Sequence, residues 1–374
     1  MPATKIVVSI PGERTYDVRV GEGVLARLGA SMRAVPELER ADRALIITDS
    51  AVGPLFRDRA KAALRDAGFR TNDISVPSGE QSKSVEVAGE IWEAMADLAL
   101  ERDCVVVALG GGVVGDLAGF VAACYMRGVP VVQVPTTLLS MVDSSVGGKA
   151  GVNLAAGKNL VGAFKQPSFV CADTGLLSSL PDREWACGCG EIAKCSVIDS
   201  DEFFFWLSDH AGDLARREPA VTEEAIARSV VFKADVVAED KTESRGVREC
   251  LNYGHTLGHA VEKLAGYGVF SHGAAVAEGM RFAARLGQKL IGTSADLVSA
   301  QDALLDELGL PALAWSAPPE DMLAAMKRDK KARHGVVRFV MPRDIGDWEL
   351  REVGDDVILD ALREWEAGKR AQGR

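Results

Sequence analysis

Residues 248–259, RECLNYGHTLGH, hold the side chains best suited to bind a metal ion or an anion. On a single α-helix, four polar side chains of this segment would point within roughly 60° of one another. They are Arg248, Asn252, His255 and His259. Helix faces in water normally carry Lys and Glu, whereas this stripe carries Asn and His between apolar neighbours. We therefore interpret the stripe as one wall of a site.

A zinc ion could be held by some of these residues, because a catalytic zinc site typically uses three protein ligands and keeps one position open. His255 and His259 are four residues apart and could both bind, and Glu191 could supply a carboxylate. Spacing does not choose among them. Cys187 and Cys189 could also bind zinc, but no second pair completes a set of four, so structural thiols are favoured. The odd number of cysteines, seven, predicts reduced thiols.

A glycine triplet, residues 110–112, follows the apolar run 104–109 and precedes a helix expected through residue 124. Glycines here would let the backbone approach a pyrophosphate at a helix N-terminus. The spacing is not the GxGxxG fingerprint, so a tight structural turn is the alternative. Asp49, at the end of the run 44–48, could accept hydrogen bonds from ribose hydroxyls.

Residues 143–164 carry five glycines together with Lys149, Lys158, Asn153 and Asn159. Mobile backbone amides and ammonium groups suit a phosphate or a carboxylate. A P-loop is excluded, because neither lysine is followed by Ser or Thr. A solvated glycine loop without a ligand is the alternative.

The elements that must position these residues differ between the two halves of the chain. The first half alternates helix candidates with short β-branched runs, which predicts an α/β fold with a parallel sheet; the runs are 44–48, 104–109 and 131–134. From about residue 179 the pattern changes to long amphipathic segments, which predict a mostly α-helical second half; these are 221–240, 248–264 and 274–291. We expect the site between the two halves.

Composition restricts the class of protein further. With 374 residues and 47% hydrophobic content, the chain can form two domains. A net charge of −11 argues against a nucleic-acid surface. No apolar run resembles a signal peptide or reaches the roughly 20 residues that a membrane span requires. We expect a cytoplasmic protein that binds neither nucleic acid nor membrane.

Between about residues 78 and 331 the chain resembles the 3-dehydroquinate synthases, which are sugar-phosphate cyclases. The matching segments are GGGVVGDLAGFVAACYMRG, VPTTLLSMVDSSVGGKAGVN, GKNLVGAFKQP, GEIAK, LNYGHTLGHAVE and the SHG that contains His272. The resemblance implies a Rossmann-like, NAD-binding domain over residues 1–178 and a helical, metal- and substrate-binding domain over 179–374. It also implies a homodimer with bound NAD and zinc, for which cobalt could substitute.

The same resemblance implies roles for individual residues. The zinc ligands would be Glu191, His255 and His272, while His259 would face the substrate phosphate. NAD would lie across Asp49, Glu80, Lys83, Gly111, Gly112, Asp116, Thr136 and Thr137, with Lys149 and Lys158 close by. The phosphate would be held by Lys149, Asn159, Asn252, His259, Lys330 or Lys331, and Arg127 of the partner copy. Lys233 and Arg248 would bind the substrate carboxylate, and Asp143, Lys158 and Lys194 would line its hydroxyl side.

The implied activity is conversion of 3-deoxy-D-arabino-heptulosonate 7-phosphate to 3-dehydroquinate by oxidation, phosphate elimination, reduction, ring opening and aldol closure. Another sugar-phosphate cyclase, a metal-dependent alcohol or glycerol dehydrogenase, and a non-catalytic NAD-binding sensor are the alternatives. An enzyme for a small neutral alcohol would not need the two lysines of residues 143–164 or the pair Lys233 and Arg248. The chain departs from the family pattern at Lys241, where the family commonly has Glu, and at Ala274.

Overall fold

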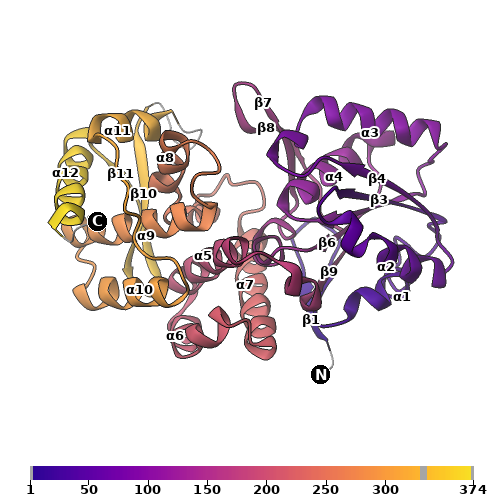
Figure 1. The fold of residues 1–374 in the computed structure, drawn as a ribbon, viewed down its shortest axis with the longest axis horizontal. Helices are drawn as coiled ribbons and strands as arrows, with labels where there is room; N and C mark the ends of the chain where they lie inside the picture. Colours follow the sequence, from indigo (N-terminus) through magenta and orange to yellow (C-terminus); the bar gives the residue numbers. More distant parts are fainter. Residues whose placement is uncertain (1–2, 329–334, 372–374) are drawn as a thin grey trace. The chain divides into compact units, whose positions relative to one another are not determined.

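The computed structural model describes residues 3–328 and 335–371. The chain forms two compact units, the first from Met1–Pro181 and Ile226–Ala238, the second from Asp182–Ala225 and Glu239–Arg374 (Figure 1). Helix α7, Pro219–Glu239, therefore supplies residues to both units. Within the described residues, none of the helices combines the length and hydropathy that a bilayer crossing requires.

The first unit is built on a seven-stranded sheet with the order β1-β2-β9-β6-β5-β3-β4. Strands β1 and β2 pair antiparallel, and the other neighbours pair parallel. The central strands are buried along almost their whole length, as expected where helices cover both faces. The strands are β1 Thr4–Val8, β2 Tyr16–Gly21, β3 Arg43–Asp49, β4 Arg70–Val76, β5 Val105–Gly110, β6 Val131–Pro135 and β9 Phe169–Asp173.

Alternate side chains of β5 face two separate cores. Val105, Val107 and Leu109 pack with residues of α1, Leu28–Arg33, and α2, Gly53–Asp66. Val106 and Ala108 pack with residues of α3, Val85–Asp97, and α4, Gly112–Cys124. Figure 1 shows α3 and α4 on one side of the sheet and α1 and α2 on the other. This layering confirms the predicted α/β fold with a parallel sheet.

Residues 143–164 do not form the solvated glycine loop that was the alternative to an anion site. After the short helical turn Ser140–Ser144, the chain forms an antiparallel hairpin of β7, Lys149–Leu154, and β8, Gly157–Phe164. Gly151 and Gly162 face each other across it, and a Cβ atom on Gly162 would lie 2.3 Å from the carbonyl oxygen of Ala150. These two glycines thus allow close approach of two strands.

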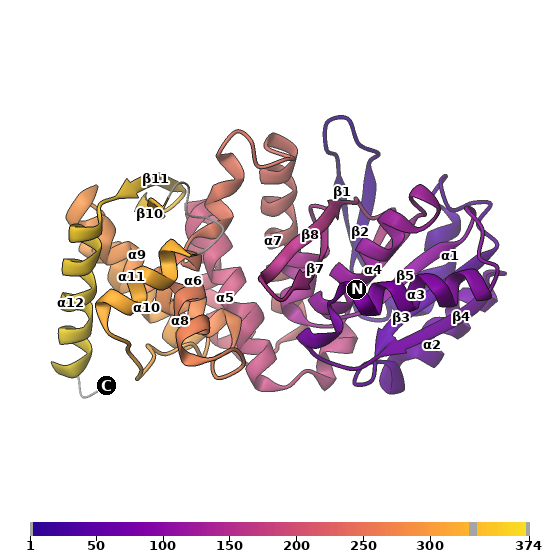
Figure 2. The same cartoon turned by 90° about the horizontal axis from the view of Figure 1, so that it is seen from above.

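The second unit is mainly helical, as predicted, but it also contains a β-hairpin that the sequence patterns did not reveal. Its strands β10, Val337–Asp344, and β11, Asp347–Val353, lie beside α9 (Figure 2). Residues of α8, α9, α11, α12 and β10 share one apolar core. The helices are α5 Asp182–Asp199, α6 Asp201–Ala215, α8 His255–Ala265, α9 His272–Leu290, α10 Ala295–Glu307, α11 Pro319–Lys327 and α12 Asp355–Ala371. Short helical turns are Val24–Arg27, Glu80–Ser82, Tyr125–Arg127, Thr174–Ser179 and Val247–Asn252.

The predicted single helix over residues 248–264 is also wrong. The chain forms the turn Val247–Asn252, breaks at Gly254, and starts α8 at His255. Gly254 has a φ of 78°, in the left-handed region that favours glycine. Arg248 and Asn252 therefore do not share one helical stripe with His255 and His259.

Candidate functional site

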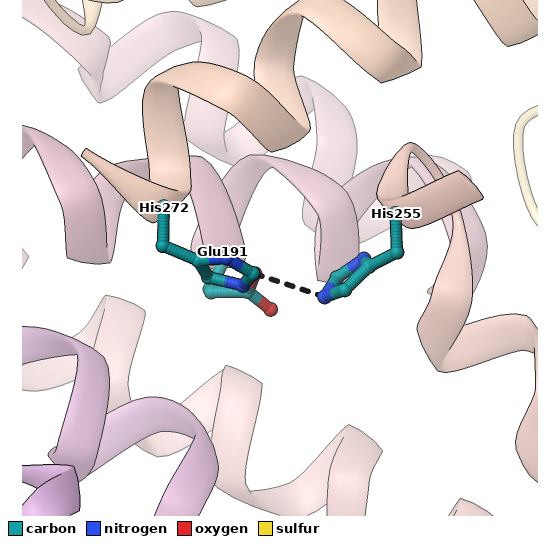
Figure 3. Close-up of side chains that lie close together, drawn as sticks. All are labelled: Glu191, His255 and His272. Atoms are coloured by element: carbon teal, nitrogen blue, oxygen red, sulfur yellow. Dashed lines mark ion pairs between the residues drawn. The ribbon is translucent and has the colours of Figure 1, made fainter. Parts of the chain in front are cut away.

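Three side chains of the second unit converge on one point although they come from three different helices. Glu191 of α5 is 2% exposed, and its Oε2 accepts a hydrogen bond from Lys194 at 2.5 Å. Its Oε1 has no hydrogen-bond partner within the described residues. That oxygen lies 3.6 Å from Nε2 of His255 and 3.6 Å from Nε2 of His272 (Figure 3). A buried carboxylate oxygen without a donor suits a cation.

The remaining nitrogen of each imidazole faces an oxygen atom. Nδ1 of His255 lies 3.1 Å from the carbonyl oxygen of Tyr253, and Nδ1 of His272 lies 3.0 Å from Oε2 of Glu262. A carbonyl or carboxylate oxygen only accepts, so in each neutral ring Nδ1 carries the hydrogen and Nε2 keeps its lone pair. Two nitrogen lone pairs and one carboxylate oxygen therefore point into the same space.

This donor set fits a divalent ion such as zinc. With metal–ligand bonds of about 2.1 Å at tetrahedral angles, neighbouring ligand atoms lie about 3.4 Å apart, close to the observed separations. His259, Glu262 and His272 form a second group whose ligand atoms also lie within 4.8 Å of one another. Cys187 is buried, and its Sγ accepts a hydrogen bond from the backbone of Gly273 at 3.2 Å.

Charge around His272 changes its basicity. Burial works to lower the pKa of His272, but the hydrogen bond to Glu262 and the negative charges of Glu191 and Glu262 outweigh it and raise the pKa above its usual value. Without an ion, the site therefore attracts protons to the same nitrogen that an ion would use.

Glycines let the ligand-bearing helices approach one another. A Cβ atom on Gly273, next to His272, would lie 2.3 Å from the carbonyl oxygen of Cys187 on α5. A Cβ atom on Gly279 would lie 1.8 Å from the carbonyl oxygen of Gly254, just before α8. Any side chain at these positions would push α9 away from α5 and from the start of α8, so the glycines bring His272 to the other two ligands.

In the first unit, several of the predicted residues follow the carboxyl ends of neighbouring parallel strands. Asp49 ends β3, Gly111 follows β5, and Thr136 follows β6. The chain continues from β3 to β4 on one side of β5, whereas β6 lies on its other side, so β3 and β5 flank a topological switch point. Ligands of open α/β sheets bind at such a point.

The local contacts at this edge are specific. Oδ1 of Asp49 accepts hydrogen bonds from the backbone of Ala51 at 2.8 Å and Val52 at 2.9 Å. A Cβ atom on Gly111 would lie 3.1 Å from Cγ2 of Thr137. Oγ1 of Thr136 is buried and has no hydrogen-bond partner among the described residues. This edge therefore has a turn held by the Asp49 carboxylate, a glycine that lies close to a neighbouring side chain, and a buried hydroxyl without a partner among the described residues.

Two ion pairs of the first unit join residues that are far apart in the sequence. Lys83 binds Asp116 at 2.5 Å, and Lys233 binds the side chain of Asp143 at 2.6 Å and its carbonyl oxygen at 2.5 Å. Burial raises the pKa of Asp116, and the charge of Lys83 opposes this shift only in part.

The β7–β8 hairpin brings its two asparagines together. Oδ1 of Asn153 accepts from the backbone of Asn159 at 2.9 Å, while Nδ2 of Asn153 donates to Glu80 at 2.8 Å. Lys149 and Lys158 are exposed on the same hairpin.

Two further predicted residues lie at the two ends of the α4 region. Gly112 begins α4, and Arg127, just after this helix, has a left-handed φ of 69°.

In the second unit, Arg248 is almost fully buried at 1% exposure. Its guanidinium donates to the carbonyl oxygen of Lys241 at 3.0 Å, and its Nε lies 3.6 Å from the carboxylate of Glu243. Lys241, which departs from the family pattern, therefore contacts Arg248 through its main-chain carbonyl group. Asp240, also buried, accepts from the backbone of Arg248 at 3.3 Å and so fixes the start of the turn.

The sequence patterns missed three residues that contact predicted site residues or one another, Glu249, Arg338 and Glu262. Nδ2 of Asn252 donates to Glu249 at 3.0 Å, and Glu249 in turn accepts from Arg338 at 2.8 Å. Glu262 contacts His272. The spacing of three residues from Glu249 to Asn252 was the only available signal, whereas Arg338 lies 89 residues from Glu249.

The predicted roles themselves stay predictions. Lys233 belongs to the first unit and Arg248 to the second, so their shared role in carboxylate binding is also a prediction. Lys330 and Lys331 lie outside the described residues.

Comparison with known proteins assigns the family. The family models "3-dehydroquinate synthase N-terminal" and "3-dehydroquinate synthase C-terminal" match residues 73–187 and 188–332. A 3-dehydroquinate synthase from Rhodopirellula baltica is 47% identical over 359 residues, which is 95% of this chain and 94% of the relative. One from Symbiobacterium thermophilum is 46% identical over 354 residues, covering 94% and 97%.

Solved structures show the same architecture. A 2-deoxy-scyllo-inosose synthase complexed with carbaglucose-6-phosphate, NAD+ and Co2+ superposes with a TM-score of 0.87 at 28% identity, covering 96% of this chain and 99% of that chain. A probable glycerol dehydrogenase from Sinorhizobium meliloti shares the fold, with a TM-score of 0.61 at 17% identity over 95% of this chain and 97% of that chain. The sequence matches over 94–95% of the chain and the two family models together show that the chain belongs to the 3-dehydroquinate synthase family.

Proposed function

We propose that this chain converts 3-deoxy-D-arabino-heptulosonate 7-phosphate to 3-dehydroquinate and inorganic phosphate, a lyase step of aromatic amino-acid biosynthesis in the cytoplasm. The observation that carries this proposal is the identity of 42–47% to 3-dehydroquinate synthases over at least 90% of the chain. Five alcohol, butanol or glycerol dehydrogenases of the same fold share 14–18% identity with it.

We propose NAD and a divalent ion, zinc or cobalt, as the cofactors. A 2-deoxy-scyllo-inosose synthase contains NAD+ and Co2+, and a 2-epi-5-epi-valiolone synthase from Streptomyces hygroscopicus contains NAD+ and Zn2+; each is 28% identical to this chain. In the first unit, the glycine turn and the strand ends at Asp49 and Thr136 would hold NAD, whereas Glu191, His255 and His272 in the second would hold the ion. When bound, NAD would supply a reversible hydride transfer, and the ion would supply a positive charge that polarises a hydroxyl group of the substrate.

The protein's own side chains would act mainly by orientation. Lys149, Asn159 and His259 would fix the phosphate so that one of its oxygens removes the proton acidified by the neighbouring ketone. Phosphate then leaves with the electron pair of its C–O bond. The proposed conversion would then require reduction of the ketone, ring opening and an intramolecular aldol reaction that closes the carbocycle. Arg248 would hold the carboxylate by a bidentate pair, which the ammonium of a lysine cannot reproduce.

We further propose a homodimer in which Arg127 acts in the partner's site. Met126 and Arg127 have consecutive left-handed φ angles of 49° and 69°, which non-glycine residues rarely adopt. Strain of this kind persists where a side chain must be presented in a fixed direction, and it supports a role for Arg127.

The test follows phosphate and reduced nicotinamide together over many turnovers of the heptulosonate phosphate. Phosphate should accumulate linearly, while reduced nicotinamide should never exceed the enzyme concentration, because it exists only during the cycle. Chelator should stop the reaction, and zinc or cobalt should restore it. Arg248→Lys should also be slow.

Two results would contradict the proposal. Stoichiometric formation of NADH with glycerol, without phosphate release, would identify a dehydrogenase. Faster turnover of a hexose phosphate without a carboxylate would identify one of the sister cyclases, which share the fold at 28% identity.

A further inference from the structure

Glu262 has no assigned role, yet it contacts a proposed metal ligand. It lies on α8, seven positions after His255, and its side chain is 13% exposed. Its Oε2 lies 3.0 Å from Nδ1 of His272, at the start of α9. The opposite nitrogen of that ring faces Glu191 at 3.6 Å. One imidazole thus lies between two carboxylates, each approached by a different nitrogen.

Glu262 could take part in two mutually exclusive arrangements. It belongs to the group His259, Glu262 and His272, whose ligand atoms lie within 4.8 Å of one another. If that group bound an ion through Nδ1 of His272, this nitrogen would need a lone pair. A carboxylate that accepts a hydrogen bond from Nδ1 requires a hydrogen there, and a protonated nitrogen cannot bind a metal.

We propose that Glu262 is a positioning residue that keeps the hydrogen of His272 on Nδ1 and holds the ring so that Nε2 binds the ion together with Glu191 and His255. This inference rests on the metal site of the proposed function. Groups of this kind orient metal-binding histidines in many proteins.

The two histidine ligands differ in how they are held. The backbone carbonyl of Tyr253 performs the same task for His255, and no side-chain substitution can remove it. His272 depends on a side chain, so its orientation can be tested by mutation.

The experiment measures zinc affinity by competition with a chromophoric chelator, without any assay of activity. Four full-length proteins are compared: wild type, Glu262→Ala, Glu262→Gln and the control Glu307→Ala, which removes an exposed carboxylate from the end of α10. Glu262→Ala should weaken zinc binding about 10- to 100-fold. Glu262→Gln should lose less, because its amide oxygen still accepts from Nδ1. The control should match wild type, and each should bind one ion per chain in this site.

Three outcomes would overturn the inference. If wild type binds zinc and Glu262→Ala binds it within twofold, Glu262 does not position His272. If wild type binds two ions and Glu262→Ala only one, Glu262 is itself a ligand. If wild type binds no zinc, this inference and the proposed metal site both fail. If Glu262→Ala does not fold, Glu262→Gln decides. A loss of zinc affinity as large as that from removing a direct ligand would refute the positioning role. A smaller loss, with unchanged visible absorption of bound Co2+, would support it.

Discussion

The two carboxylate oxygens of Glu191 have different surroundings, and this difference defines the site. Oε2 is paired with Lys194, and Oε1 faces two imidazoles. Both partners of the ion pair are 2% exposed. A buried pair of this kind contributes little compared with an apolar pair, but removing one partner leaves an uncompensated buried charge.

Lys194→Met should therefore destabilise the metal-free protein by about 3–5 kcal/mol. The double variant Lys194→Met/Glu191→Gln should recover much of this loss, because the unpaired charge is gone. Urea unfolding in the presence of chelator measures both. If Lys194→Met unfolded at the same urea concentration as wild type, Lys194 would not neutralise Glu191.

The seven cysteines should differ sharply in reactivity, because only Cys124 is exposed. Burial raises the pKa of Cys187, Cys189 and Cys250 to about 12, so these thiols stay protonated at pH 7 and at pH 9. An aromatic disulfide reagent should titrate one thiol rapidly in the native protein at both pH values, and all seven after denaturation. Rapid reaction of three or more native thiols would contradict this assignment.

Among the helices and strands, the break at Gly254 decides where the ligands lie. Its φ of 78° belongs to the left-handed region, and a Cβ atom there would lie 2.5 Å from the carbonyl oxygen of Val276 on α9. Gly309, at the end of α10, has the same φ of 78°, but nothing lies within 4 Å of its Cβ position.

Gly309→Ala should cost only the backbone strain, about 1–2 kcal/mol. Gly254→Ala adds a collision with the α9 backbone, so we expect a larger loss of stability and weaker zinc binding as His255 moves away from Glu191. Thermal unfolding and the chelator competition measure the two effects. Equal losses in both variants, with zinc affinity unchanged, would show that the close approach does not position the site.

These elements also show what the sequence could and could not predict. The buried strands β3, β5 and β6 and the helices α7 and α9 were predictable, because the apolar pattern that defines each of them lies within one short stretch of sequence. The break at Gly254 was not, because the periodic pattern continues through it and the reason for the glycine lies on α9, more than twenty residues later. The five glycines of residues 143–164 were interpreted as loop residues because a strand that uses glycine for close packing lacks the usual alternation.

The candidate site, too, was predictable only in part from the sequence. His255, His259 and Glu191 were recognised as possible ligands by residue type, but residue type and spacing alone did not choose among them. Only the resemblance to the family pointed to His272 as the third ligand. Arg338 was missed because its partner Glu249 lies 89 residues away in the sequence. Glu262 was missed because Glu is common on exposed helix surfaces, so its type and position on α8 did not indicate a contact with His272.

On the scale of the whole molecule, the proposed dimer can be tested by complementation. Arg127→Ala and Arg248→Ala should each be inactive alone. If Arg127 acts across the dimer, a mixed dimer contains one site with both arginines, and random mixing should restore about a quarter of wild-type activity. Subunits are exchanged under mild denaturant, and phosphate release is measured. No recovery from a sample shown to contain mixed dimers would mean that Arg127 acts in its own subunit.

Helix α7 has a consequence for how proteins of this architecture can be recombined. Its residues Ile226–Ala238 belong to the first unit although they follow more than forty residues of the second. Lys233 lies on this stretch and pairs with Asp143. A hybrid made by one crossover after Pro181 would therefore join the sheet of one parent to the α7 of the other. Two further crossovers, around residues 226 and 238, would be needed to transfer the first unit intact. Exchange of cofactor specificity between relatives thus requires a grafted helix segment together with the N-terminal sheet.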